Sequence, residues 1–323
     1  MNILVTGGLG FIGHHVASNL EKLGNNITVI DSAENYNIMT TDELSYLYKL
    51  RLDKIKNSRL FRFNITEVEK INKIFCDGKF DVVIHCASPP RQKIVATDPV
   101  KFSDSMIKGT LNLLEHSKQH GVKKFVFISS SMVYGNFSNN TTEQTICNPI
   151  GTYGILKLSG ELLVKDYSNH FDYTIIRPSA VYGPYDCKDR VIAKYFINAI
   201  NSEKLYVNGI NEHLDFSYIS DVAKGITNAA LSTNTTNKIY NITRSKSVSL
   251  FDAANLIIQI VGKGEIVINE KESNFPSRGS LSILQASKDF GYEPTINIEQ
   301  GLKLYYDWLR NSIFWPTTTI RKN

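Results

Sequence analysis

The first 31 residues constrain the fold of this chain more than any other stretch. A short apolar run leads into three glycines, an amphipathic segment follows, and a second apolar run ends on an acid. The glycines are Gly7, Gly10 and Gly13, and the acid is Asp31. This order predicts a strand, a tight turn, a helix and a second strand. Three glycines alone fit an ordinary strand–helix turn, but the full context with the acid favours a nucleotide site.

Each part of this stretch has a physical role in binding a dinucleotide. A helix N-terminus carries unpaired N–H groups and a partial positive charge, so it attracts a diphosphate. Glycine lets the backbone approach phosphates without a Cβ in the way, although the spacing here is G-x-x-G-x-x-G rather than the common G-x-G-x-x-G. Asp31 is placed to accept hydrogen bonds from the adenosine ribose and would repel a 2′-phosphate, and no Lys or Arg lies between it and Lys49. We therefore expect NAD as the cofactor.

The bulk composition fits a globular protein that binds a small anionic molecule. The 323 residues are enough for one or two domains, and 42% of them are hydrophobic. The net charge is +5, but the Lys and Arg residues are scattered, so we expect no nucleic-acid partner. The four cysteines lack metal-site spacing, and no apolar run approaches the roughly 20 residues that span a bilayer. Without a signal peptide, a reduced cytoplasmic protein with no metal and no membrane partner is expected.

Apolar runs alternate with amphipathic segments through the first 178 residues. This alternation predicts an α/β fold with a doubly wound parallel (Rossmann) sheet, whose ligands lie beyond the C-terminal ends of the strands. We expect an NAD-binding domain over 1–178, with returns from about 213–262, and a smaller mixed α/β substrate-binding domain over 179–323 with a polar tail from Pro316. Other expected elements are a loop with a short helix over 32–52, a helix over 66–75 capped by Thr66, unbroken helices over 99–119 and 153–168, and a helix over 281–290.

A serine-tipped strand and a Tyr-x-x-x-Lys pair carry the candidate chemistry. The run Phe125–Ile128 ends in three serines, and Tyr153 and Lys157 follow four residues apart, on one helix face. A free tyrosine, with a pKa of about 10, is a poor base at neutral pH, but an ammonium one turn away and oxidised nicotinamide both favour the phenolate. Tyr153 would take a proton from a substrate hydroxyl while hydride leaves the same carbon, and a serine would orient that oxygen. The alternative is a surface pair, since about one such spacing arises by chance.

With these residues in place, the chain resembles the extended short-chain dehydrogenase/reductases, and within them the NAD-dependent nucleotide-sugar epimerase/dehydratase family. The resemblance extends from residue 2 to about 310. It is specific for the family and only weakly specific for the substrate. The motifs that carry it are Thr6–Gly13, His85–Ala87, Ser129–Gly135, Tyr153–Lys157, Arg177–Pro184, Asp215–Phe216, Asp221–Ala223 and Tyr240–Ile242.

The resemblance implies a role for residues in each motif. Ser130 matches the catalytic Ser/Thr, Tyr153 the catalytic base, and Lys157 its partner, which also binds the nicotinamide ribose. The residues implied to bind the cofactor are Gly7, Gly10, Phe11, Ile12, Gly13, Asp31, Ser32, Asn64, Ile65, Cys86, Ala87, Ser88, Tyr153, Lys157 and Pro178. Those implied to bind the substrate are Ser88, Ser130, Ser131, Tyr153, Ala180, Arg190 and Arg278, the last of which matches an arginine that grips the substrate diphosphate.

Several positions depart from the family pattern. Leu214 stands where relatives often carry an arginine, and Ala180 stands where many carry an asparagine, so two expected substrate contacts are missing. The dehydratases of the family place Asp-Glu after the catalytic threonine, as the acid and base for water elimination. Here Ser131 and Met132 follow Ser130 instead, and neither can do that work. A 4,6-dehydratase is therefore not expected.

These features favour an NAD-dependent nucleotide-sugar 4-epimerase that transiently oxidises C4 of the sugar, with a UDP-hexose as the first substrate class and GDP or dTDP sugars next. The alternative enzyme is an NAD(P)H-dependent 4-keto-sugar reductase or a nucleotide-sugar dehydrogenase, which would use the same three residues. A nucleotide-sensing scaffold is the alternative outside enzymes, although such proteins often lose the Tyr or the Lys. The resemblance also implies a homodimer, in which the helices over 99–119 and 153–168 pair across a two-fold axis.

Overall fold

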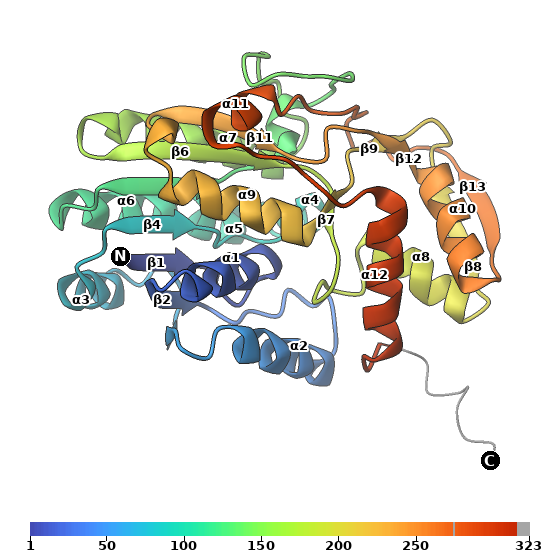
Figure 1. Ribbon diagram of the computed structural model, residues 1–323, viewed down its shortest axis with the longest axis horizontal. Helices are drawn as coiled ribbons and strands as arrows, with labels where there is room; N and C mark the ends of the chain where they lie inside the picture. Colours follow the sequence, from blue (N-terminus) through green and yellow to red (C-terminus); the bar gives the residue numbers. More distant parts are fainter. Residues whose placement is uncertain (274, 315–323) are drawn as a thin grey trace.

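The computed structural model describes residues 1–273 and 275–314. At its centre is a seven-stranded sheet in the order β11-β6-β5-β4-β1-β2-β3, with every neighbouring pair parallel (Figure 1). Its strands are β1 (Asn2–Thr6), β2 (Asn26–Asp31), β3 (Arg59–Arg62), β4 (Val82–His85), β5 (Lys124–Ile128), β6 (Asp172–Pro178) and β11 (Lys238–Ile242). The predicted doubly wound parallel sheet is confirmed. The polar tail expected from Pro316 lies outside the described residues.

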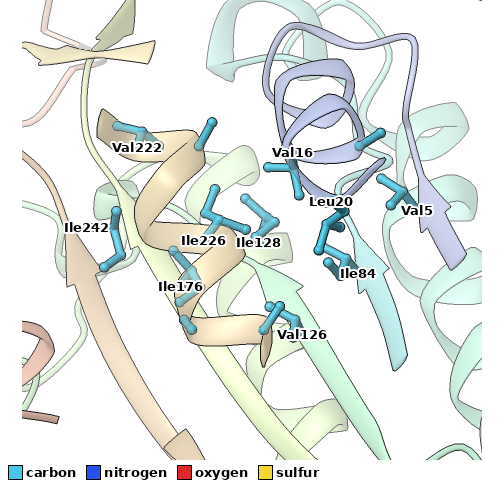
Figure 2. Close-up of a cluster of buried hydrophobic side chains, with 14 of the residues drawn as sticks. Val5, Val16, Leu20, Ile84, Val126, Ile128, Ile176, Val222, Ile226 and Ile242 are labelled. Carbon is cyan, nitrogen blue, oxygen red and sulfur yellow. The ribbon is translucent and has the colours of Figure 1, made fainter. Parts of the chain in front are cut away.

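Helices cover both faces of this sheet. One face packs against α1 (Phe11–Lys22) and α9 (Ile219–Leu231), and the other against α3 (Val68–Gly78), α6 (Gly109–Gln119) and α7 (Thr152–Asp166). Figure 2 shows Val16 and Leu20 of α1 and Val222 and Ile226 of α9 directed toward the apolar side chains of the strands. Because both faces are covered, the central strands are apolar at nearly every position, as buried parallel strands require.

The strand order places the ligand site. From β1 the chain adds β2 and β3 on one side, then crosses back to lay β4 on the other side of β1. The connections that leave β1 and β4 therefore diverge, and a crevice opens at their C-terminal ends. The glycine turn follows β1, and Cys86–Ser88 follow β4, so both segments lie at this crevice.

A second, smaller core lies beyond the C-terminal ends of the strands (Figure 1). Two parallel strands, β8 and β13, pack with three helices around it. Its elements are β7 (Val181–Tyr182), α8 (Val191–Ile200), β8 (Lys204–Asn208), β9 (His213–Leu214), β10 (Ser217–Tyr218), β12 (Val248–Ser249), α10 (Leu250–Val261), β13 (Glu265–Asn269) and α12 (Ile298–Arg310). The elements of the smaller core are interrupted twice in the sequence. After β10 the chain adds α9 and β11 to the large sheet, and after β13 it adds α11 (Leu284–Phe290).

The predicted helix cap at Thr66 is wrong. The helix α3 begins at Val68, and its N-cap residue is Glu67, which makes no side-chain capping bond. The Thr66 hydroxyl instead donates to Asn64 Oδ1 at 3.0 Å, and the Thr66 N–H donates to the same oxygen. An Asn side chain that bonds two residues ahead forms a local turn. Thr66 belongs to this turn, so the helix begins after it.

Three other expectations needed correction in detail. The segment expected as a loop with a short helix over 32–52 forms most of a 14-residue helix, α2 (Thr41–Lys54). A capping box between Thr40 and Glu43 closes its N-terminus. The helix expected over 99–119 is α5 (Pro99–Ser103) and α6 joined by a π-helical turn, Asp104–Lys108. The helix expected over 281–290 begins only at Leu284, because Leu281 is extended and forms a β-bridge with Thr141.

Candidate active site

The glycine turn has no room for side chains at its key positions. A Cβ on Gly7 would lie 2.6 Å from the backbone nitrogen of Ala87, and a Cβ on Gly13 would lie 2.1 Å from the Gly7 carbonyl oxygen. Gly7 also has φ +69°, where residues other than glycine are strained. The turn is held by hydrogen bonds from Gly7 N–H to the Ile30 carbonyl and from Gly10 N–H to the Gly7 carbonyl. A rigid cradle of bare backbone before a helix N-terminus is what a dinucleotide diphosphate needs.

Asp31 lies where the predicted ribose contact requires it, and it also holds the glycine turn in place. It lies at the C-terminal end of β2 and lines the cavity, as the ribose contact requires. Its Oδ2 also accepts a hydrogen bond from Leu9 N–H at 2.9 Å, and its Oδ1 accepts one from Ala33 N–H at 2.8 Å. Burial raises the pKa of this carboxyl, while the two backbone bonds and Arg51 oppose that rise. Asp31 therefore also braces the glycine turn, a bond across 22 residues that the sequence pattern does not show.

One cavity of about 580 Å³ runs from the glycine turn into the smaller core. Its lining includes every residue that the sequence assigned to the cofactor or the substrate, from Gly7 and Asp31 at one end to Arg190 and Arg278 at the other. The structure thus brings segments as distant as Asn64 and Arg278 to one space. This placement is compatible with the implied roles, which remain predictions.

Tyr153, Lys157 and Ser130 meet in the middle of this cavity. Tyr153 and Lys157 are one turn apart on α7, and both side chains are buried. The Lys157 ammonium lies 5.9 Å from the centre of the Tyr153 ring and donates to the carbonyl oxygen of Ile128 at 2.8 Å. Ser130 follows β5, and its hydroxyl lies close enough to oppose the rise in the pKa of Tyr153. The arrangement fits a proton transfer at the tyrosine oxygen.

The charges around Tyr153 differ from those that the sequence predicted. Burial raises the pKa of Tyr153, and the groups that oppose this rise are the Arg190 guanidinium first and the Ser130 hydroxyl second. Lys157, the cation expected to favour the phenolate, has its own pKa lowered to about 8 by burial. The sequence-based explanation of how the phenolate is favoured is therefore incomplete, because it leaves out Arg190. This residue comes from a loop 37 residues further along the chain. Helical spacing gives no sign of such a contact.

A further supporting residue was missed from the sequence. The side-chain oxygen of Gln92 accepts a hydrogen bond from Tyr153 N–H at 3.0 Å, at the unpaired N-terminus of α7. A Cβ on Gly151 would meet the Gln92 side chain at 2.0 Å, so the glycine makes room for this contact. Gln92 lies in α4 (Gln92–Val95), a one-turn helix with no pattern that marks it as functional.

The substrate end of the cavity is lined by guanidinium groups. Arg190 pairs with the buried carboxylate of Asp186 at 3.7 Å, and Arg91 pairs with Asp189. Arg278 contacts the Met132 sulfur at 3.8 Å, and its pKa is lowered to about 10 by burial and by the charge of Arg190. Within the described residues, the Nε atoms of these three arginines are buried without hydrogen-bond partners. Guanidinium N–H groups that have no hydrogen-bond acceptor fit an anionic ligand such as a diphosphate.

Neither a metal site nor a membrane span is found in the part of the chain that the structure describes. In residues 1–273 and 275–314, no three His, Cys, Asp or Glu side chains are grouped so that they could hold a metal ion. Over the same residues, no helix combines the length and the apolar character needed to cross a bilayer.

The parallel sheet, the glycine cradle, the acid after β2 and the Ser–Tyr–Lys group define an NAD-dependent enzyme of the extended short-chain dehydrogenase/reductase class. The chain belongs to the NAD dependent epimerase/dehydratase family, whose model matches residues 3–243. The predicted family and its cofactor, NAD, are confirmed. The glycine cradle and Asp31 are the residues of this chain that would hold the diphosphate and the adenosine ribose.

Known relatives match almost the whole chain. A UDP-glucuronate 4-epimerase of Thermodesulfobacterium geofontis is 32% identical in an alignment of 321 positions that covers 96% of each chain. The crystal structure of a UDP-glucuronic acid 4-epimerase from Bacillus cereus, with UDP-glucuronic acid and NAD, superposes with a TM-score of 0.89 at 28% identity and covers 96% of this chain and 99% of its own. A UDP-glucose 4-epimerase from Thermotoga maritima, solved with UDP-glucose, gives a TM-score of 0.87 at 28% identity, with the same coverage.

Proposed function

We propose that this enzyme is a nucleotide-sugar 4-epimerase that acts on a UDP-hexose. The observation that carries the proposal is the position of the Tyr153 hydroxyl, which lies in one cavity with the cofactor cradle and with the unpaired arginines. A sugar nucleotide whose diphosphate binds Arg278 would extend its sugar toward Tyr153. The relatives that act on UDP-glucose and UDP-glucuronic acid support this assignment.

In the proposed reaction, the Tyr153 oxygen takes the proton of the sugar 4-hydroxyl. Ser130 donates to the same region and steadies the developing charge, and the Arg190 guanidinium favours the phenolate form of Tyr153. NAD held by the glycine cradle and Asp31 would supply the acceptor, and later the donor, of the hydride at C4. The 4-keto sugar then turns within the cavity, and Tyr153 gives the proton back to the oxygen of the other epimer.

The segment 32–54 favours an epimerase over a reductase or dehydrogenase. Residues of this segment line the cofactor end of the cavity, and charged contacts fasten it on several sides. Lys101 pairs with Glu34 at 2.7 Å, Lys188 pairs with Glu43 at 2.5 Å, and Arg51 donates to the carbonyl oxygens of Leu9 and Tyr185. An epimerase returns its hydride and keeps its cofactor, so a fastened wall suits it. A reductase must exchange the cofactor in every cycle, and such a wall would hinder it.

The residues after Ser130 argue against a dehydratase. The Ser131 hydroxyl donates a hydrogen bond to the Ser179 hydroxyl at 3.2 Å. Met132 is buried, and its sulfur contacts Arg278. Neither side chain can serve as the acid or the base of water elimination at neutral pH.

One observation favours a second substrate class. Arg190 lines the same cavity as Tyr153, and its charge opposes the rise in the pKa of Tyr153, which fits a guanidinium beside the reacting sugar. A diphosphate bound to Arg278 would leave Arg190 to meet a group on the sugar itself. A carboxylate is the group that guanidinium binds best, so a UDP-hexuronate is the second candidate.

The proposal is tested by NMR on the purified protein with UDP-hexoses, UDP-hexuronates, and GDP- and dTDP-hexoses, with NAD and no reductant. NADH absorbance is followed in the same samples. New epimer signals without lasting NADH are the expected result. A steady rise of NADH would make the protein a dehydrogenase. No change with any donor, followed by turnover of a 4-keto sugar with NADH, would make it a reductase.

We also propose that the protein is a homodimer. Large apolar side chains are exposed on the two helical segments that the resemblance places at a dimer interface: Val100 is 81% exposed, Ile155 is 50% exposed and Leu162 is 58% exposed. Covering them would release water from apolar surface. Sedimentation should show a species of twice the chain mass, and a monomer at all concentrations would contradict the proposal.

A further inference from the structure

A buried carboxylate lies on the same helix face as the two candidate catalytic residues. Glu161 follows Lys157 by one helical turn and Tyr153 by two turns on α7, and its side chain is 0% exposed. The proton transfer proposed above has no use for this acid, and it does not line the cavity. A carboxylate this deeply buried must be paired and hydrogen-bonded.

Glu161 binds Ser129, which directly follows β5, and Arg177, which lies in the neighbouring strand β6. Its Oε1 accepts hydrogen bonds from the Ser129 hydroxyl at 2.5 Å and from Arg177 Nε at 2.9 Å. Its Oε2 accepts from Arg177 Nη2 at 2.6 Å, so the ion pair is bidentate. Arg177 is itself buried and lies 4.8 Å from the centre of the Tyr134 ring. The carboxylate therefore ties α7 to the ends of β5 and β6.

The strand end that Glu161 holds touches both candidate catalytic groups. Ser129 lies between Ile128, whose carbonyl oxygen accepts a hydrogen bond from the Lys157 ammonium at 2.8 Å, and Ser130, whose hydroxyl acts on the pKa of Tyr153 and lines the same cavity. The Ser129 N–H also donates to the Ile176 carbonyl oxygen at 2.8 Å. Any movement of Ser129 would thus shift the partner of Lys157 and the partner of Tyr153 together.

The sequence allows the close contact that this arrangement needs. A Cβ on Gly160 would lie 2.6 Å from the Phe127 ring of β5, so only glycine lets α7 approach the strand this closely. Stability alone does not require the ion pair, because a buried pair often contributes no more than apolar side chains of the same size. Its geometry, which joins one helix and two strand ends at the site, is what apolar packing would not supply.

We propose that Glu161 is a positioning residue, which fixes the end of β5 through Ser129 so that Ser130 and Lys157 are held at Tyr153. Arg177 balances its charge and holds its second oxygen. Glu161 touches neither the cofactor site nor the sugar site and acts through Ser129 and Lys157. The inference rests on the proposed roles of Ser130, Tyr153 and Lys157, but not on the identity of the sugar.

The first test removes only the bond between Ser129 and Glu161. In Ser129→Ala the ion pair with Arg177 remains, so the fold should be retained. We expect kcat to fall about 10-fold, since small displacements at a site have effects of this size or larger. KM and the content of bound NAD should not change, and Ser129→Thr should restore the rate.

A matched control is Ser117→Ala. Ser117 is a fully buried serine on α6 whose hydroxyl has no hydrogen-bond partner among the described residues. It should retain the wild-type kcat. A Ser129→Ala enzyme with wild-type kcat, or one that loses kcat only in proportion to its folded fraction, would overturn the inference.

The second test needs no substrate. The groups that raise the pKa of Lys157 are Cys86 and Glu161, and His85 at the end of β4 also faces it. Glu161→Gln removes a nearby negative charge, so the Lys157 ammonium should lose its proton at a lower pH. Titration of the Lys157 ε-carbon signal in ¹³C-labelled protein measures this shift directly. A folded Glu161→Gln protein with the wild-type midpoint would contradict the inference, whereas failure of the epimerase assay alone would contradict only the proposed function.

Discussion

The two ends of the cavity differ in what lines them: backbone at the cofactor end and charged side chains at the substrate end. At the cofactor end, backbone does the work: Gly7 and Gly13 leave no room for a Cβ, and hydrogen bonds within the turn fix its shape. At the substrate end, long charged side chains line the wall; Arg278 Nε has no hydrogen-bond partner among the described residues, and Arg190 Nε has only its 3.7 Å ion pair with Asp186. A backbone cradle accepts one kind of ligand and tolerates little change. A wall of side chains can change its ligand with one substitution.

The energetic situation of the two ends differs as well. At the cofactor end, the carboxylate that lines the cavity beside the glycine turn is paired, since Asp31 accepts hydrogen bonds from Leu9 N–H and Ala33 N–H. The substrate end leaves guanidinium groups close enough for Arg190 to lower the pKa of Arg278. Like charges that are held together and only partly paired favour the binding of an anion. The comparison predicts that substitutions at the cofactor end affect NAD binding, while those at the substrate end affect nucleotide-sugar binding.

The largest expected effect comes from the residue between the two ends. Tyr153→Phe removes the oxygen that takes the proton and leaves both ends intact. We expect kcat to fall by about 1,000-fold or more, as loss of a positioned acid–base group does. NMR detection of the epimer gives the rate, and bound NAD and KM should remain near wild type. A variant with more than a tenth of the wild-type rate would show that Tyr153 is not the base.

The next effect sharpens the account of the cofactor end. Gly7→Ala places a methyl group 2.6 Å from the Ala87 nitrogen, so the cradle must open. We expect NAD affinity to fall by about 30-fold or more, which corresponds to roughly 2 kcal/mol. Gly24→Ala is the matched control, because Gly24 also has a positive φ of +80° but has no atom within 4 Å of the added Cβ. Calorimetry should show normal NAD binding for Gly24→Ala, and equal losses in both variants would refute the steric explanation.

An effect of similar size is expected at the substrate end. Arg278→Gln removes a charged donor from the wall, and hydrogen bonds to charged groups contribute about 1.5–3 kcal/mol. We expect KM for the nucleotide sugar to rise about 10- to 100-fold, with NAD affinity unchanged. Steady-state kinetics and NAD titration distinguish the two. A loss of NAD binding in this variant would show that the two ends are not separate.

The smallest effect is a pH dependence of the wild-type enzyme. Lys157, with a pKa near 8, is charged below that pH and neutral above it. We predict that this charge adds to that of Arg190 in favouring the tyrosinate, so the rate should decline as pH rises, to about half of its maximum at pH 8. A pH profile of kcat between pH 6 and pH 10 checks this. A rate that stays constant to pH 10 would mean that Lys157 does not act through its charge.

Much of the fold could be predicted because it rests on local patterns. The strands and helices of the sheet follow from apolar runs and helical periodicity, and the glycine turn follows from spacing. The predicted cap at Thr66 failed because Thr66 belongs to a turn that Asn64 forms, and the helix begins only at Val68, a choice between two local structures that a pattern cannot rank. Gln92 and Arg190 were not seen as partners of Tyr153, since both contacts depend on how loops fold over the sheet.

The sequence by itself determined the parallel sheet, the NAD cradle and the Tyr153–Lys157 pair, because each depends on residues within one turn or one strand–helix unit of each other. Only the tertiary structure decided which charges act on Tyr153, how Asp31 braces the glycine turn, and how Glu161 ties α7 to two strand ends. These contacts join segments that are 16 to 37 residues apart. They form only once the apolar core has fixed the sheet and its helices, so their partners cannot be predicted from local spacing.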